Sequence, residues 1–162
     1  MRIARVYHGS VVDGPGRRSV VQFQGCPIRC AGCYVPETHS LTGGMSVPID
    51  SVVYDLLSAN AEPRDGITVL GGEPFAQVNA LLDVLNAVKA KGVHTTVYSG
   101  YTLEALASPK RPEVRAALEL IDLLIDGPYV EALADGAGEW RGSRNQRLIE
   151  CPGRALAAGE AR

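Results

Sequence analysis

Apolar strands alternate with amphipathic helices through most of this sequence, and this alternation limits the possible folds more than any other feature. Four segments are short and apolar or loosely alternating, as in strands of a buried sheet. They are residues 19–24, 66–70, 93–98 and 120–125. Helical stripes separate them, starting at residue 49 and covering 78–88, 103–107 and 113–119. Because the connection between parallel strands is long and usually helical, the alternation predicts a parallel sheet wrapped by helices.

The length of the chain limits how complete such a structure can be. Its 162 residues suit one domain, residues 1–162. A closed eight-fold β/α barrel typically needs about 250 residues, so this chain can build only part of one. The predicted fold class is therefore α/β, a partial, open β/α barrel with a parallel sheet. We expect a last short strand at 148–149 and a flexible tail at 150–162, frayed from residue 155.

Composition and charge exclude several classes of protein. Apolar residues make up 46% and charged residues 21% of the chain, which is typical of a folded globular protein. The first twelve residues include Arg2, Arg5 and His8 and lack the continuous apolar run of a signal peptide or membrane span. The net charge of −2 provides no broad positive field for nucleic acid. These features predict a cytoplasmic protein with neither a membrane nor a nucleic acid as its partner.

Three of the four cysteines lie in one short loop, residues 25–34, directly after the first predicted strand. Cys26, Cys30 and Cys33 have the spacing CxxxCxxC. In a reducing compartment such a group indicates metal or redox chemistry rather than disulfides. Thiolates are soft ligands that favour iron–sulfur clusters, zinc or Cu(I). Three thiolates on a four-iron cluster leave one iron free to bind a ligand, and this arrangement favours a catalytic [4Fe–4S] cluster.

Two alternatives remain open for these cysteines: a structural zinc site and a simple electron carrier. A structural zinc ion takes four protein ligands, and the loop supplies three. The only further candidates for a fourth ligand are His39 and the distant Cys151. No residues around Cys151 have the spacing of metal ligands.

Two further loops rich in turn residues follow predicted strands. Gly71-Gly72-Glu73-Pro74 comes after strand 66–70, and Ser99-Gly100 comes after strand 93–98. The carboxyl ends of parallel strands meet at one edge of a sheet, where α/β proteins place their sites. Glycines allow the backbone to approach a cofactor closely, and Glu73 offers an acceptor to an ammonium group. We therefore expect these loops beside the cysteines.

The cysteine loop ends in an aromatic residue, Tyr34, and is followed after a helix and a strand by Gly-Gly-Glu-Pro. In this it resembles the radical S-adenosylmethionine superfamily. Four further segments are similar to the glycyl-radical enzyme activases, and in particular to the family of anaerobic ribonucleoside-triphosphate reductase activating proteins. They are Asp13-Gly14-Pro15-Gly16-Arg17, Ser99-Gly100-Tyr101, residues 121–128 and residues 140–146. The resemblance runs from about Val12 to Ile149.

The resemblance implies a role for each matching residue. Cys26, Cys30 and Cys33 would be the catalytic residues and cluster ligands, and the free iron would bind the methionine amino and carboxylate groups of S-adenosylmethionine. The resemblance also implies contacts with three parts of the cofactor. The adenine side would be contacted by Gly32, Cys33 and Tyr34, the methionine amine by Gly72 and Glu73, and the carboxylate or ribose by Ser99 and Asp126.

The resemblance also implies the activity and the partners. An electron from a flavodoxin- or ferredoxin-type reductant would cleave S-adenosylmethionine to methionine and a 5′-deoxyadenosyl radical. That radical would take a hydrogen atom from a glycine of a large glycyl-radical enzyme, anaerobic ribonucleotide reductase. The cofactor carries this chemistry, and the protein binds, orients and protects it. Two alternatives remain: a radical enzyme acting on another glycyl-radical enzyme, a peptide or a small molecule, and a non-enzymatic zinc or iron–sulfur module.

The chain departs from the family pattern beside the cofactor. Val35 and His39 stand where an asparagine and a tryptophan are common, and Pro128 replaces a lysine found in many activases. The segment with Trp140 and Arg141 fits either a lid over the cofactor or a docking surface for the partner, and the sequence leaves both open.

Overall fold

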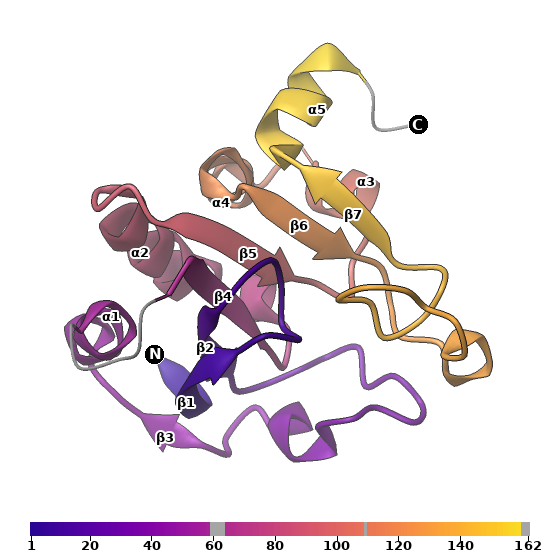
Figure 1. The fold of residues 1–162 in the computed structure, drawn as a ribbon, viewed down its shortest axis with the longest axis horizontal. Helices are drawn as coiled ribbons and strands as arrows, with labels where there is room; N and C mark the ends of the chain where they lie inside the picture. Colours follow the sequence, from indigo (N-terminus) through magenta and orange to yellow (C-terminus); the bar gives the residue numbers. More distant parts are fainter. Residues whose placement is uncertain (59–63, 109, 160–162) are drawn as a thin grey trace.

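The fold is described from a computed structural model, which covers residues 1–58, 64–108 and 110–159. Figure 1 shows the arrangement of its helices and strands. In chain order the elements are β1 (Arg2–Ser10), β2 (Arg18–Phe23), η1 (Pro36–His39), β3 (Met45–Ser46), α1 (Ile49–Leu57), β4 (Gly66–Gly71), η2 (Pro74–Gln77), α2 (Val78–Lys89), β5 (His94–Tyr98), α3 (Leu103–Leu106), α4 (Pro112–Leu120), β6 (Leu123–Asp126), η3 (Glu131–Leu133), β7 (Arg147–Glu150) and α5 (Pro152–Ala158), where η marks a 3-10 helix.

One sheet organises the chain. Within the described residues it has seven strands in the order β3-β1-β2-β4-β5-β6-β7. The central strands β2, β4, β5 and β6 are parallel to one another, whereas β1, β3 and β7 run antiparallel to their neighbours. The expected α/β class is confirmed, with a mixed sheet in place of a purely parallel one. The closure of this sheet into part of a barrel stays a prediction.

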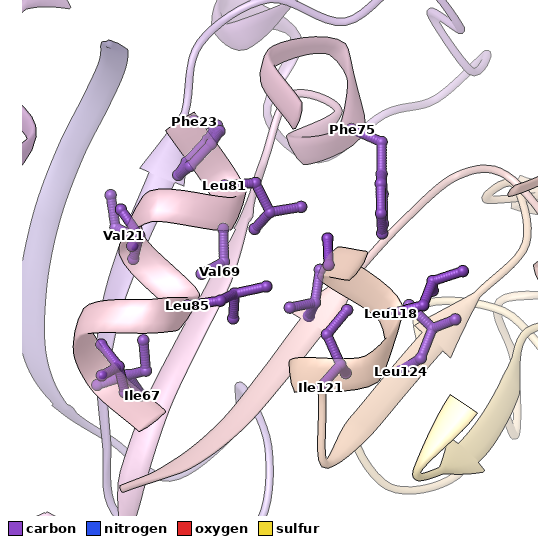
Figure 2. Close-up of a cluster of buried hydrophobic side chains, with 14 of the residues drawn as sticks. Val21, Phe23, Ile67, Val69, Phe75, Leu81, Leu85, Leu118, Ile121 and Leu124 are labelled. Atoms are coloured by element: carbon purple, nitrogen blue, oxygen red, sulfur yellow. The ribbon is translucent and has the colours of Figure 1, made fainter. Parts of the chain in front are cut away.

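The main helices cover one face of the sheet. Helix α1 packs on α2, α2 on α4, and α4 on α5, and Figure 1 shows α1, α2 and α4 on the same side of the sheet. Alternate strand residues point toward this layer, because successive side chains of a strand face opposite sides. Figure 2 shows side chains of α2 lying against those of β2 and β4. The core side chains labelled there are Val21, Phe23, Ile67, Val69, Phe75, Leu81, Leu85, Leu118, Ile121 and Leu124.

The opposite face of the sheet carries polar residues at the intervening positions. Arg18 of β2 is only 1% exposed, and its guanidinium donates hydrogen bonds to the hydroxyls of Thr68 and Thr96, each at 3.0 Å. Burial lowers the pKa of Arg18 to about 10. Gln22 and Tyr98 continue this face toward the carboxyl ends of their strands. Such hydrogen bonds satisfy the buried polar groups of this face within the protein. Near the strand ends, the polar side chains of this face are available to a ligand.

Most predicted elements are present, with shifts of one to three residues at their ends. Strands β1 and β3 were not expected. Strand β1 pairs with β2 through two register irregularities, which disturb the alternation that identifies a strand. Helix α5 occupies Pro152–Ala158, where the sequence suggests a flexible tail, and residues 160–162 of that tail lie outside the described residues. No helix in the described parts of the chain is long and apolar enough to span a membrane.

Candidate functional site

A cavity of about 490 Å³ opens on the polar face of the sheet, at the carboxyl ends of β2, β4 and β5. The segments that follow the parallel strands gather around it, including 24–44 and 127–146, which Figure 1 shows at the same end of the molecule. Its lining includes the cysteine loop, both glycine turns and the segment after β6. Among the residues that line it are Asp13, Gln22, Cys26, Cys30, Cys33, Tyr34, His39, Leu70, Gly72, Glu73, Tyr98, Ser99, Gly100, Tyr129, Trp140, Arg141 and Gln146.

The cysteine loop folds back on itself so that all three thiols line this cavity. Gly25, Arg29 and Gly32 have positive φ angles of 95°, 51° and 71°, which turn the backbone sharply. Cys26, Cys30 and Cys33 are free and partly buried, and burial raises the pKa of the Cys26 thiol. The sequence prediction that these residues share one site is consistent with this placement.

Three thiolates are soft ligands that suit an iron–sulfur cluster as well as zinc. Within the described residues, no three His, Cys, Asp or Glu side chains gather closely enough to hold one ion. A cluster binds each thiolate through a different iron, so its ligands stand farther apart than those of a lone zinc ion. The three thiols and the cavity beside them fit a [4Fe–4S] cluster, and ligation by these cysteines stays a prediction.

His39 and Cys151, the two other candidate ligands of a metal or cluster, lie in different parts of the structure. His39 lines the cavity, and its Nε2 atom is buried without a hydrogen-bond partner among the described residues. Cys151 lines a separate hollow with Lys89 and Asp122, and its amide donates to the carbonyl of Asp122 just before β6 begins. Cys151 is therefore at the amino edge of the parallel strands, opposite the cysteine loop.

The turn after β4 is bound tightly to the start of the cysteine loop. The Gly72 amide donates to the Phe23 carbonyl at 2.8 Å, and the Glu73 amide donates to the Gly25 carbonyl at 2.9 Å. A Cβ atom at Gly72 would overlap the Gly25 carbonyl. The second glycine of this turn is thus required by the close approach of two backbones, whereas the sequence suggested close approach to a cofactor.

Glu73 joins three loops beneath the cavity. Its carboxylate is fully buried and accepts hydrogen bonds from the Phe75 amide at 3.0 Å, the Gly100 amide at 2.8 Å and the Ser99 hydroxyl at 3.0 and 3.1 Å. Burial raises its pKa to about 7, against the effect of these donors. Its oxygens are therefore occupied, and Glu73 holds the Ser99–Gly100 turn in place.

Asp126 is one of two predicted contacts, with Gly32, that do not line the cavity. Its buried carboxylate accepts a hydrogen bond from the Leu103 amide at 2.6 Å and pairs with the Arg147 guanidinium. Asp126 is two residues after Leu124, a core residue, so its side chain points to the helix-covered face. Asp126 therefore caps α3 from the helix-covered face, and its expected contact with a carboxylate or ribose stays a prediction.

Gly32 and Tyr34 lie at the outer rim of the site. A Cβ atom at Gly32 would lie 2.7 Å from the carboxyl carbon of Glu131, so glycine allows the cysteine loop to rest on η3. The ring of Tyr34 is 71% exposed and lies 4.9 Å from the ring of Tyr129, centroid to centroid. Tyr34 lines the cavity, whereas Gly32 supports the loop from behind.

Several cavity residues were missed or left unassigned in the sequence. Asp13 was named only as part of a segment similar to the activases and given no role, and its carboxylate accepts hydrogen bonds from Tyr7 and Ser10. Gln22 and Tyr98 occupy the strand positions between core residues. The alternation of each strand was the available signal. Successive side chains of a strand face opposite sides, so a polar residue between core positions faces away from the helix layer.

Comparison with known proteins places the chain in a family. Residues 12–149 match the model of the family described as "4Fe-4S single cluster domain". The chain belongs to this family. A [4Fe–4S] cluster is therefore its cofactor, and the matched region contains all three cysteines of the loop.

Curated relatives of this 4Fe-4S single cluster domain protein cover nearly the whole chain. The anaerobic ribonucleoside-triphosphate reductase-activating protein of Vibrio cholerae is 34% identical over 90% of this chain and 96% of its own length. The protein of the same name from Escherichia coli K12 is 31% identical over the same shares. The pyruvate formate-lyase-activating enzyme of Clostridium pasteurianum is 36% identical over 59% of this chain and 42% of its own length. Every relative named here is an activating protein or enzyme.

Proposed function

We propose that this chain is a radical S-adenosylmethionine activase that generates a glycyl radical on a partner enzyme, anaerobic ribonucleoside-triphosphate reductase. When bound, the [4Fe–4S] cluster supplies the electron that cleaves S-adenosylmethionine reductively. The chain binds both groups in one cavity and leaves that cavity open to a loop of the partner. The similarity to reductase-activating proteins along 90% of the chain supports this partner over the others.

One observation carries the proposal. The three free thiols of the CxxxCxxC loop line the same cavity as the Gly72-Glu73 and Ser99-Gly100 turns. These are the segments through which the chain resembles radical S-adenosylmethionine proteins. An electron-transfer protein has no need of an additional cavity beside its cluster, whereas an enzyme that binds a cofactor there does.

The residues have distinct roles in the proposal. Cys26, Cys30 and Cys33 hold the cluster, and Tyr34 borders the adenine side of the cofactor. Glu73 acts as a positioning residue, because its carboxylate binds the Ser99–Gly100 turn while its amide donates to Gly25 at the start of the cysteine loop. The two turns then face the methionine part of the cofactor.

The remaining assignments belong to the same proposal. The chain works as one domain, and the electron comes from a flavodoxin- or ferredoxin-type reductant. The sheet and its helices form an incomplete barrel whose open side admits the partner's glycine loop. A loop of a large enzyme reaches a cofactor more easily through an open side than through a closed barrel mouth.

The test uses protein reconstituted anaerobically with iron and sulfide, a strong reductant and S-adenosylmethionine. The proposal predicts release of 5′-deoxyadenosine, and a glycyl radical in electron paramagnetic resonance only when the reductase is added. Cofactor cleavage without a radical on the reductase would redirect the assignment to another glycyl-radical enzyme, a peptide or a small molecule. A protein that contains zinc without sulfide and releases no 5′-deoxyadenosine would refute the enzyme function.

A further inference from the structure

Arg141 is the one arginine or lysine among the described residues that line the cavity. It follows Trp140 in the segment between β6 and β7, and its Nε atom is buried without a hydrogen-bond partner among the described residues. The guanidinium makes one long hydrogen bond, from Nη1 to the Gln146 carbonyl at 3.5 Å. Most of its donors therefore have no hydrogen-bond partner among the described residues, in a side chain that lines the cavity.

No carboxylate of the described residues forms an ion pair with Arg141. The two acidic residues that line the same cavity already have other partners. Asp13 accepts from Tyr7 and Ser10, and Glu73 accepts from Ser99 and two backbone amides. A partly buried guanidinium without a counter-charge gains most from an anion that a ligand brings.

The segment that carries Arg141 is fixed on both sides. The Tyr98 hydroxyl donates to the Trp140 carbonyl at 2.8 Å. The side chain of Gln146 accepts from the Gly142 amide at 2.7 Å and donates to the Gly127 carbonyl at 3.0 Å. A contact made by a fixed loop loses little conformational entropy when the ligand binds. This bonding indicates a built position for the guanidinium rather than a freely moving surface side chain.

We infer that Arg141 binds the carboxylate of the methionine part of S-adenosylmethionine. The inference rests on the proposed function, because it assigns the cofactor to this cavity. That carboxylate is the one anionic group of the cofactor, and a fork of N–H donors matches it in shape. Apart from the free iron, the residues predicted or expected at this carboxylate supply no positive charge: Asp126 faces the helix layer, the Ser99 hydroxyl donates to Glu73, and Pro128 carries no charge.

The test compares two ligands on cluster-containing protein without a reductant, so that neither ligand is consumed. Dissociation constants of S-adenosylmethionine and of decarboxylated S-adenosylmethionine are measured by calorimetry for the unchanged protein, R141Q, R141K and R144Q. Arg144 is an exposed arginine of the same segment that does not line the cavity, so R144Q is the matched control. The ratio of the two constants within one protein is independent of how much of that protein is folded or contains cluster.

We expect R141Q to weaken S-adenosylmethionine binding by about 10- to 100-fold, since a hydrogen-bonded ion pair is lost. Binding of the decarboxylated ligand should stay unchanged, R141K should recover part of the loss, and R144Q should match the unchanged protein. Equal weakening of both ligands in R141Q would overturn the inference and make Arg141 a structural residue. Unchanged binding of both would also overturn it. If the unchanged protein binds no S-adenosylmethionine, the proposed function itself fails.

Discussion

Glu73 shows how one buried carboxylate organises the site. Its side chain is fully enclosed, and the backbone amides of Phe75 and Gly100 point at its oxygens. Amide donors favour the ionised form, whereas removal from water favours the protonated form. Burial is the larger effect, so the pKa lies at about 7. Glu73 therefore changes its charge near neutral pH, where the Ser99–Gly100 turn depends on it.

The first prediction follows from that pKa and concerns stability. The folded protein holds the Glu73 proton more tightly than the unfolded chain, whose Glu titrates near 4.5. Between about pH 4.5 and 7 the unfolded state therefore binds fewer protons, and the free energy of unfolding falls as the pH rises. The total loss is roughly 3 kcal/mol. Above pH 7 the contribution is constant.

Urea denaturation of the cluster-free protein from pH 4 to 8, under reducing conditions, measures this slope. The matched variant Glu73→Gln has no titrating group at this position, so its free energy of unfolding should lack this dependence on pH. Its overall stability should be lower, because one of the two oxygens that accept hydrogen bonds is lost. The difference between the two proteins removes the contribution of the histidines. Parallel pH profiles for the two proteins would show that folding does not raise the pKa of Glu73.

Residue identities were predicted better from sequence than the directions in which side chains point. The three cysteines and the two glycine turns were found because their spacing and position after strands are local signals. The family resemblance assigned Asp126 to the cofactor, but its parity with Leu124 directs it to the helix layer and to Arg147. The guanidinium of Arg141, which has no ion-pair partner within the described residues, depends on contacts between segments far apart in sequence, which no local pattern contains.

At the scale of elements, strong periodicity made the prediction possible. Helix α2 and strands β4 and β5 were predicted within one residue at either end. Strand β1 was missed because its charged residues and register shifts hide its alternation, and β3 has only two residues. Helix α5 was missed because its apolar residues become meaningful only when it packs on α4. Tertiary contacts decide such marginal elements.

The second prediction concerns the contact between the turn after β4 and the cysteine loop. Gly72→Ala places a methyl group against the Gly25 carbonyl, which belongs to a backbone hydrogen bond and cannot move aside easily. We expect a loss of roughly 1–3 kcal/mol in the free energy of unfolding, as for overpacking. We also expect lower iron content after reconstitution, because the start of the cysteine loop is displaced.

Gly92→Ala is the control for that variant. Gly92 has a φ of 66° and nothing within 4 Å of the added Cβ atom, so it reports backbone strain alone. This control should lose about 1 kcal/mol and keep its full iron content. Equal iron content in the two variants would show that the fit at Gly72 does not position the cysteines.

Across the whole molecule, the sheet separates two environments for cysteine. The loop with Cys26, Cys30 and Cys33 follows the carboxyl end of β2, beside the cavity. Strand β7 runs antiparallel to β6, so the chain leaves β7 at the amino edge of the parallel strands, and Cys151 begins α5 there. A residue at that edge cannot reach a cluster at the other one without unpairing β7. The topology thus favours a cluster with three protein thiolates.

The third prediction tests this separation with paired serine variants. Cys30→Ser removes a ligand at the cavity, and Cys151→Ser removes the thiol at the opposite edge. After anaerobic reconstitution, Cys30→Ser should lose most of its iron and sulfide, whereas Cys151→Ser should keep about four of each per chain, as a [4Fe–4S] cluster requires. The cluster of Cys151→Ser should also keep its change in electron paramagnetic resonance when S-adenosylmethionine is added, because its free iron is unaffected. Loss of iron in Cys151→Ser would mean that a fourth thiolate completes the cluster, leaving no iron for the cofactor.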